Sequence, residues 1–311
     1  MTHHFNKAKA DQVLSCLDED PRTIETALGP IEYAERGEGP VVLSVHGGPG
    51  GYDQGLALSE VFHQAGFRVI APSRAGYLGT PATHGSTYEQ QADMHAALLD
   101  ALGIDEAIVV GASAGGPSVY TLAQRHPHKV KALIPIDCVS MKYTKIQEIS
   151  KTQEFLYLSK PGIWFIDYLM KHFPASMVTS FLKTESTLNK AEVKQRMKEI
   201  IDDEDKLAFL KLMMATMTQR YDERQPGLAV DIKILTAIDK IPLNRITCPT
   251  LIVHGKSDSD VGPNQAEYAH ESIAGSELLW VEKGSHIGFW VAKEAYAVQE
   301  KTINWLNGVL G

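Results

Sequence analysis

Short apolar runs alternate with segments of helical periodicity in much of this chain. The runs are rich in Val, Ile and Leu and lack a polar alternation, which is typical of strands buried on both faces of a parallel sheet. Between them, apolar residues recur at helical spacing and glycine ends two of the segments, as expected for helices. The pattern therefore predicts an α/β fold with a mostly parallel, doubly wound sheet. The predicted strands are Val41–Val45, Arg68–Pro72, Ala107–Val110, Val130–Ile136 and Thr250–His254, followed by Glu277–Val281.

The predicted helices between these strands are Leu56–Ala65, Thr87–Leu102, Gly115–Arg125, Asn264–Glu271 and Ala292–Leu310. Residues 1–20 predict an amphipathic helical lead-in. Thr23–Thr26 and Ile31–Ala34 predict an antiparallel hairpin around the turn at Gly29. Pro135 is unusual inside its predicted strand, because proline has no backbone N–H to donate.

The strand–helix alternation is interrupted between residues 140 and 240. This stretch is helix-like, poor in strands and rich in Lys, Glu, Met, Leu and Phe. Neither flank alone completes a sheet. We therefore predict one core domain formed by residues 1–139 and 241–311, with residues 140–240 as a helical insertion.

Composition and charge narrow the class of protein. The 311 residues are 44% hydrophobic and carry a formal net charge of −8, without a basic stripe. Nucleic acid and anionic membranes are therefore not expected as partners. The expected partner is a small-molecule substrate. Cys16, Cys138 and Cys248 are scattered and fit neither a disulfide framework nor a metal site. With no secretory signal or long apolar run, the chain is predicted to be cytoplasmic; nothing indicates its oligomeric state.

Ser113 is the strongest candidate for chemistry. It follows an apolar strand, precedes a predicted helix and lies in Gly111-Ala112-Ser113-Ala114-Gly115. This is the G-x-S-x-G elbow, in which a tight turn exposes the serine Oγ at the end of a strand. Glycines are needed because side chains there would collide with the neighbouring elements. We predict that Ser113 is a catalytic nucleophile.

A serine nucleophile needs a base, and the elbow fold presents its triad in the order Ser, acid, His. His286 follows the last predicted strand, in Lys283-Gly284-Ser285-His286, where a loop can lean over the sheet. It is our predicted base. The other histidines after the elbow lie in helices, in a strand or in the insertion: His126, His128, His172, His254 and His270.

The acid is expected in the loop after the preceding strand. That loop contains Asp258 and Asp260, and Asp137 follows an earlier strand. We favour Asp258 and keep Asp260 and Asp137 as alternatives, since a carboxylate at each of these places could reach the same histidine.

The oxyanion of an acyl transfer intermediate needs two N–H donors. We predict the backbone N–H groups of Ala114, next to the nucleophile, and Gly48, in His46-Gly47-Gly48-Pro49-Gly50. Pro49 is excluded because it has no N–H. No phosphate-binding or dinucleotide motif follows this loop and no metal-ligand spacing occurs, so neither a cofactor nor a metal is predicted.

These motifs, in this order, resemble the α/β-hydrolase family. The resemblance rests on the glycine loop at residues 45–50, the elbow at residues 111–116, Cys248–Gly255 with Asp258, and Gly284–His286. It implies an eight-stranded sheet, a Ser113–Asp258–His286 triad, and oxyanion donors at Gly48 and Ala114. It also implies that the insertion is a helical cap over the site.

The glycine loop resembles that of proline iminopeptidases, but two features depart from them. Ser73-Arg74-Ala75-Gly76-Tyr77 replaces their usual Asp-Gln-Arg-Gly-like run, and Ala114 stands where tryptophan is common. The stretch from Ser73 resembles esterase-like members instead. We therefore predict a serine esterase for small esters or similar acyl bonds. An aminopeptidase is the first alternative and a ligand-binding sensor with little turnover the second. Six residues of the insertion are candidates for an apolar substrate pocket: Phe155, Phe165, Phe173, Leu212, Met213 and Met214.

Overall fold

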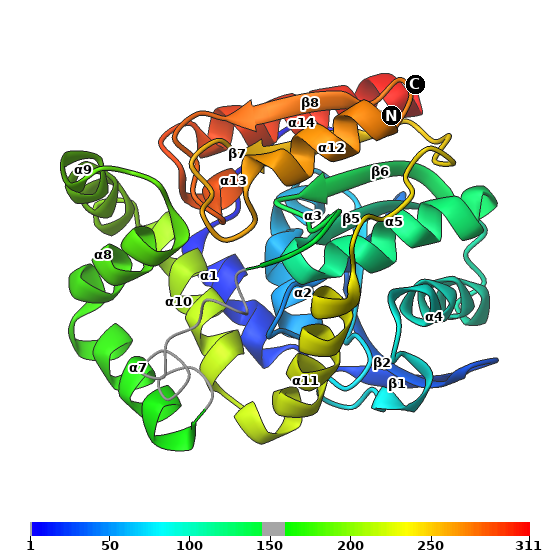
Figure 1. Ribbon diagram of the computed structural model, residues 1–311, viewed down its shortest axis with the longest axis horizontal. Helices are drawn as coiled ribbons and strands as arrows, with labels where there is room; N and C mark the ends of the chain where they lie inside the picture. The colour runs from blue at the N-terminus through cyan, green and yellow to red at the C-terminus, as the bar shows by residue number, and fades with distance from the viewer. Residues whose placement is uncertain (1, 145–158) are drawn as a thin grey trace.

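The computed structural model describes residues 2–144 and 159–311, and within these residues an eight-stranded sheet forms the centre of the protein (Figure 1). The strands follow the order β1-β2-β4-β3-β5-β6-β7-β8. β2 pairs antiparallel with β1 and with β4, and the other neighbours pair in parallel. The predicted α/β fold and its mostly parallel sheet are confirmed. The strands are β1 Arg22–Thr26, β2 Gly29–Arg36, β3 Val41–Val45, β4 Arg68–Pro72, β5 Ala107–Ala112, β6 Val130–Ile136, β7 Leu251–Gly255 and β8 Glu277–Val281.

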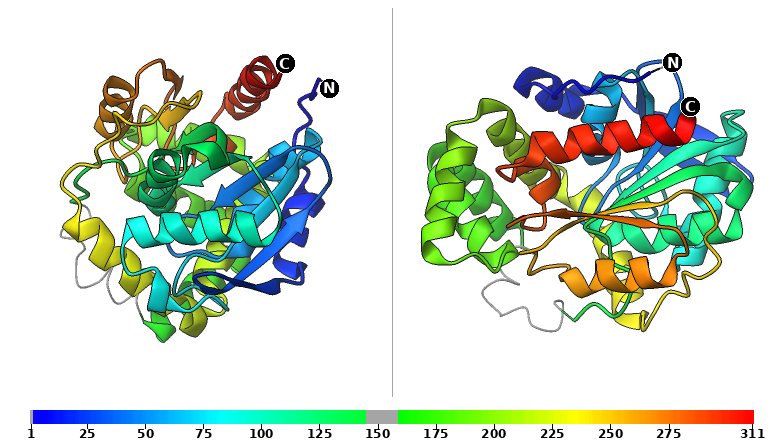
Figure 2. Two further views of the ribbon diagram at one scale, coloured as in Figure 1. Left: turned by 90° about the vertical axis from the view of Figure 1, so that its right-hand side faces the viewer. Right: turned by 90° about the horizontal axis from the view of Figure 1, so that it is seen from above.

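Helices cover both faces of the sheet, as the uninterrupted apolar strands require. In β5, Ile108 and Val110 pack on the face covered by α2, α3 and α14, whereas Val109 packs on the face covered by α4, α5 and α12. Figure 2 shows α12 and α14 on opposite sides of the sheet. These helices are α2 Tyr52–Leu58, α3 Glu60–Gln64, α4 Tyr88–Ala101, α5 Gly116–Arg125, α12 Pro263–Ser272 and α14 Ala295–Leu310.

Three helical segments differ from the predicted ones. The lead-in is helical only over α1 (Ala10–Leu14) and a following 3₁₀ turn at Ser15–Asp18. The predicted helix Leu56–Ala65 begins earlier and is broken at Ser59, which leaves helical geometry and whose hydroxyl donates to Ser44 Oγ at 2.7 Å. The last helix is preceded by a separate short one, α13 (Gly288–Val291). The periodicity of apolar residues cannot reveal a tertiary hydrogen bond such as that between Ser59 and Ser44.

Pro135 lies inside β6, paired in register with Gly111 of β5. Leu133 of β6, and Asp137 directly after it, donate their N–H groups toward β7, to Pro249 O and Val253 O. Because successive N–H groups of a strand point to opposite sides, Pro135 also faces β7. The pairing of β6 with β7 is sparse there, so the missing N–H of Pro135 removes few hydrogen bonds between the two strands.

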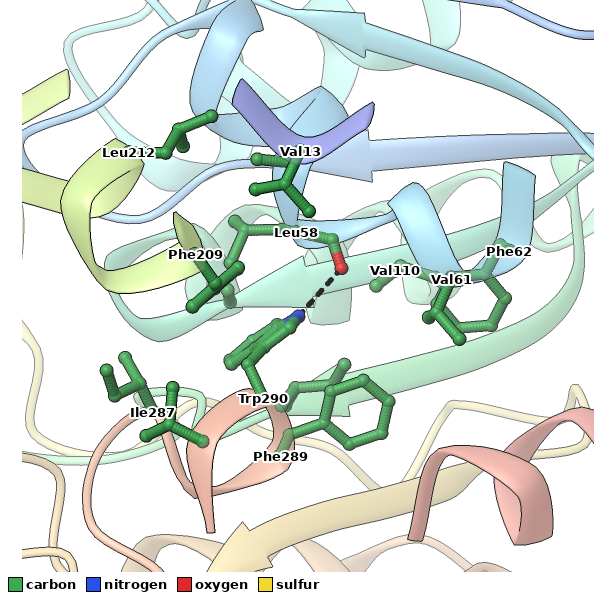
Figure 3. Close-up of a cluster of buried hydrophobic side chains, with 14 of the residues drawn as sticks. Val13, Leu58, Val61, Phe62, Val110, Phe209, Leu212, Ile287, Phe289 and Trp290 are labelled. Carbon is green, nitrogen blue, oxygen red and sulfur yellow. Dashed lines mark hydrogen bonds between the residues drawn. The ribbon is translucent and has the colours of Figure 1, made fainter. Parts of the chain in front are cut away.

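The insertion contributes helices α7 to α11 beside one end of the sheet (Figure 1). α10 joins it to the core: Phe209 stacks on Trp290 of α13 at 5.2 Å between ring centroids, and Trp290 Nε1 donates to Leu58 O at 3.0 Å (Figure 3). The helices are α7 Lys160–His172, α8 Pro174–Glu185, α9 Lys190–Ile201, α10 Glu204–Thr218 and α11 Tyr221–Ala237.

Candidate active site

Ser113 lies in a sharp turn between β5 and α5. Its φ of 50° places it in the left-handed region, which is strained for a residue with a side chain. The flanking glycines are sterically required. A Cβ at Gly111 would lie 2.5 Å from Val119 Cγ2, and one at Gly115 would lie 2.6 Å from His46 O. The predicted elbow geometry is thus present, with the serine at the carboxyl end of a central strand.

His286 and Asp258 meet Ser113 at the same edge of the sheet, where the carboxyl ends of parallel strands converge. His286 Nε2 lies 2.9 Å from Ser113 Oγ, and its Nδ1 lies 2.8 Å from Asp258 Oδ2. In the neutral ring, Nδ1–H donates to the carboxylate and Nε2 accepts from the serine hydroxyl. The three predicted residues therefore form one continuous hydrogen-bonded chain.

Asp258 is held rigidly behind the imidazole. It is 1% exposed, and its Oδ1 accepts the backbone N–H groups of Asp260 at 2.8 Å and Val261 at 2.9 Å. Its other oxygen is left for His286. Local geometry explains this arrangement, because an aspartate that accepts N–H groups two and three residues onward is a common turn motif.

The two alternative acids lie elsewhere around His286. Asp260 Oδ2 is 3.5 Å from Nε2, on the serine side of the ring, and its Oδ1 accepts from Tyr143 OH at 2.6 Å. Asp137 is buried; its Oδ1 accepts from Gly255 N at 2.8 Å, and its Oδ2 has no partner among the described residues. Neither has a described contact with Nδ1.

The carboxylates shape the protonation of the site. Burial by itself would lower the pKa of His286, but Asp258, through its charge and hydrogen bond, and then Asp260 and Asp137 raise that pKa well above its ordinary value. Burial and the charge of Asp258 raise the pKa of Asp137 well above the usual range for an aspartate. Because burial disfavours the charged form of Asp137 and this residue has no described contact with Nδ1, it is a poor candidate for stabilising an imidazolium.

Other histidines have structural partners. His254 is 1% exposed and its Nε2 donates to Val261 O at 2.8 Å. His126 contacts Asp93 at 2.7 Å and His270 contacts Ser276 at 2.9 Å. His128 lies in a 3₁₀ turn at the far end of α5, and His172 ends α7.

The glycine loop after β3 lies against the elbow. A Cβ at Gly48 would be 3.4 Å from Ala114 Cβ, so the two predicted oxyanion donors are neighbours. Gly47 N–H is already engaged, since it donates to Gln54 Oε1 at 3.0 Å. No described residue accepts from Gly48 N–H, which leaves it available to a ligand.

His46, at the start of this loop, is held in one protonation state by its hydrogen bonds. Its Nε2 accepts the backbone N–H of Arg74 at 2.9 Å, so its Nδ1 carries the proton and donates to Gly47 O at 2.6 Å. Burial and then the charge of Arg74 lower its pKa well below the ordinary value. His46 is therefore a neutral structural residue.

A cavity of about 280 Å³ opens in front of Ser113, between the sheet edge and the insertion. Its walls are mainly apolar. Of the six insertion residues predicted to line a pocket, Met213 and Met214 do. Leu212 is buried in the core instead, and Phe165 and Phe173 are 45% and 53% exposed. Phe155 lies outside the described residues.

Several polar groups of the cavity were not anticipated from the sequence. Tyr143, Glu185 and Asp231 line it together with Asp260. Four consecutive acidic residues of the insertion, Asp202, Asp203, Glu204 and Asp205, do not line the cavity. Asp203 caps α10, and Asp205 pairs with Lys7 at 2.7 Å. No local motif marks the lining residues, because the insertion folds them into place from distant positions.

One cluster has the composition of a metal site. Asp137, His254 and Asp258 bring ligand atoms within 4.8 Å of one another. Asp258 is already committed to His286 and two backbone N–H groups, and His254 Nε2 to Val261 O. Asp258 therefore has little left to offer a cation.

Comparison with known proteins gives a consistent picture. Residues 40–293 match the family model described as alpha/beta hydrolase fold. The uncharacterized hydrolase YcgS of Bacillus subtilis is 30% identical over 281 residues, covering 88% of this chain and 95% of that protein. A pimeloyl-[acyl-carrier protein] methyl ester esterase of Aromatoleum aromaticum is 26% identical, covering 75% of this chain and 86% of the relative.

Solved structures of other proteins share this fold. An alpha/beta hydrolase fold protein from Nakamurella multipartita is 36% identical, with a TM-score of 0.88 over 94% of this chain and 100% of that one. An esterase from Thermogutta terrifontis shares the fold at 20% identity and a TM-score of 0.64, covering 93% and 99%. Among the described helices, none has the length and apolarity needed to cross a membrane. This chain belongs to the α/β-hydrolase family and is a hydrolase.

Proposed function

We propose that this hydrolase cleaves a small ester, or a similar acyl bond, through an acyl-enzyme on Ser113. One observation carries the proposal: Ser113 Oγ, His286 and Asp258 form a continuous hydrogen-bonded chain, with links of 2.9 and 2.8 Å, and Ser113 and His286 line a mainly apolar cavity. The relatives named as esterases support the same reaction class.

In the acylation step, Ser113 Oγ attacks the ester carbonyl carbon while His286 Nε2 takes the serine proton. The carbonyl oxygen becomes an oxyanion, stabilised by the N–H groups of Gly48 and Ala114. Collapse of this intermediate breaks the bond to the alkoxy group. His286 returns the proton to the departing oxygen, and an alcohol leaves.

Deacylation reverses these roles with water. His286 Nε2 takes a proton from water, the hydroxide attacks the acyl carbon, and the same two N–H groups receive the second oxyanion. The carboxylic acid is released as Ser113 recovers its proton from His286. Asp258 accepts from Nδ1–H throughout and stabilises the imidazolium in both steps. The reaction draws on no cofactor.

We also propose that residues 140–240 act as a cap and set the bulk of the acyl or alcohol group. α7, α8, α10 and α11 supply much of the cavity wall. The apolar members are Ile163, Ile166, Phe181, Met213, Met214, Met217, Leu228, Ile232 and Leu235. Such a wall favours a small neutral molecule with an apolar substituent.

Labelling with a fluorophosphonate tests the proposed nucleophile. We expect one covalent adduct at Ser113, detected by mass spectrometry, and none in Ser113→Ala, which should also lose esterase turnover. Folded protein without an adduct would overturn the reaction class and would favour a binding protein with little turnover.

A second candidate is an aminopeptidase. It is favoured by the carboxylates of Glu185 and Asp260 at the cavity, because a free N-terminal amine needs an anionic partner there. Rates with p-nitrophenyl butyrate and prolyl p-nitroanilide separate the two. We expect the ester to be preferred; a preference for the anilide would assign the peptidase reaction.

A further inference from the structure

The glycine loop that carries Gly48 is held from outside the core by α11 of the insertion. Two buried ion pairs of opposite polarity make this connection. Arg224 of α11 pairs with Asp53 of α2, and Asp231 of α11 pairs with Arg74, which follows β4. Arg224 and Asp231 lie seven positions apart, two helical turns, and so share one face of α11.

Arg74 and Asp231 hold the start of the loop. Asp231 accepts from both terminal nitrogens of Arg74 at 2.6 Å each, and Tyr77 OH donates to its Oδ2 at 2.6 Å. Arg74 in turn donates to the loop carbonyls of His46 at 2.9 Å and Gly47 at 2.8 Å. A Cβ at Gly48 would be only 2.6 Å from Asp231 Oδ2, so this carboxylate packs directly on the proposed oxyanion donor.

Arg224 holds the other end. Its Nη1 donates to Gly50 O at 2.7 Å while the same guanidinium forms a forked contact with Asp53, at 3.1 and 2.5 Å. Both arginine side chains are 1% exposed. A guanidinium can make several directed bonds at once, which an ammonium group cannot do in the same geometry.

Backbone contacts keep α11 close to this region. Leu78 N donates to Glu223 O at 2.8 Å. A Cβ at Gly227 would lie 2.3 Å from the Tyr77 ring, and one at Gly76 would lie 2.8 Å from the Gly227 backbone. The segment Ser73–Tyr77 therefore connects the glycine loop and α11.

We propose that Arg224 and Asp231 of α11 are positioning residues that clamp loop 46–51 and keep the Gly48 N–H aimed at the developing oxyanion. The proposal rests on the esterase reaction proposed above. α11 is in this respect part of the catalytic core. Neither side chain exchanges protons with the substrate.

The test compares Asp231→Asn and Arg224→Lys with wild type and with Glu60→Gln. Glu60 is a matched control: it is 1% exposed and pairs with Arg36 and His63 away from the cavity. For Asp231→Asn and Arg224→Lys we expect kcat with p-nitrophenyl butyrate to fall by about 100-fold, the size of effect that a small misplacement causes. KM should change little, and Glu60→Gln should keep the wild-type kcat even where its melting temperature falls.

A trifluoromethyl ketone provides the second readout, because its adduct with Ser113 presents an oxyanion to Gly48. Its inhibition constant should rise in both clamp variants by about the factor lost from kcat/KM, and should not rise in Glu60→Gln. A loss of stability alone would not change kcat/KM and the inhibition constant by the same factor. Clamp variants with wild-type kcat and inhibition constant would overturn the proposal.

Hydrogen–deuterium exchange of the peptide containing residues 46–51 tests the clamp independently of activity. We expect faster exchange in the clamp variants than in wild type and Glu60→Gln, and unchanged exchange would count against the clamp. If Asp231→Asn does not fold, Arg224→Lys, which keeps the charge, carries the test. If wild type neither turns over esters nor reacts at Ser113, the proposed function fails, whereas active wild type with unaffected clamp variants refutes only the clamp.

Discussion

Three carboxyl groups surround His286, and their contacts separate their roles. Asp258 contacts Nδ1 at 2.8 Å, Asp260 approaches Nε2 at 3.5 Å, and Asp137 is hydrogen-bonded to Gly255 N. Only the first of these positions can fix the ring tautomer that leaves Nε2 free to accept from Ser113. The geometry therefore supports Asp258 as the acid of the proposed triad.

Replacing Asp258 by Asn should lower kcat by about 10⁴-fold, because the amide no longer stabilises the imidazolium and permits the wrong tautomer. Asp137→Asn is the matched control, because Asp137 is buried, accepts from Gly255 N and has no described contact with His286 Nδ1. Its kcat should stay close to wild type. Steady-state turnover of p-nitrophenyl butyrate measures both, and a larger loss in Asp137→Asn would reassign the acid.

The pH profile of kcat/KM should show an acidic limb lying above the ordinary range of histidine. Protonated His286 cannot take the serine proton, and its pKa is raised, so activity is gained as pH rises through that pKa. Asp260 contributes to the raised pKa by its charge. In Asp260→Asn the limb should therefore move to lower pH. A limb that stays in place, or moves to higher pH, would contradict this assignment.

At the scale of elements, the elbow between β5 and α5 depends on the absence of side chains on both sides of Ser113. The positive φ at Ser113 and the contact between Gly111 and Val119 are two consequences of one tight turn. The turn aims Oγ out of the sheet because the strand and the helix pack closely behind it.

Gly111→Ala should destabilise the protein by about 1–3 kcal/mol, since its Cβ would overlap Val119 Cγ2 and force a shift of α5. Thermal unfolding measures this loss. Gly308→Ala in α14 is the opposite case: a Cβ there meets nothing within 4 Å, and alanine should stabilise the helix by about 0.5–1 kcal/mol. Equal effects of the two substitutions would show that close packing does not explain Gly111.

At the scale of the whole molecule, the core and the insertion together form the cavity and its charge. Asp137, Glu185, Asp231 and Asp260 line it, with Asp231 paired to Arg74, and none of the lining residues in the described part of the chain is Lys or Arg. The N- and C-terminal segments meet away from it, where His3 N donates to Asn307 Oδ1 at 2.8 Å (Figure 2).

Anionic substrates should be disfavoured here. A carboxylate that enters this mainly apolar cavity loses its hydration and meets the carboxylate of Asp260. We expect kcat/KM for mono-p-nitrophenyl succinate to be at least about tenfold below that for p-nitrophenyl butyrate, a chain of equal length without the charge. Equal rates with the two esters in wild type would contradict the inference.

The sequence by itself determined the features that depend on short stretches of chain. Strand burial, the hairpin at Gly29 and the elbow at Ser113 follow from local periodicity and local sterics, which act between residues close in sequence. The proximity of Ser113, Asp258 and His286 could be expected because each follows a parallel strand, and the carboxyl ends of such strands meet at one sheet edge whatever the loops do.

Tertiary structure alone decided which carboxyl faces Nδ1, where Asp260 and Tyr143 sit, and how α11 holds the glycine loop. Arg74 and Asp231 are 157 residues apart, and no periodicity links them. Their pairing arises only when the insertion packs against the core, where two buried charges are stable together and neither is stable alone. The glycine loop could be recognised in the sequence, but the buried ion pairs that hold it could not.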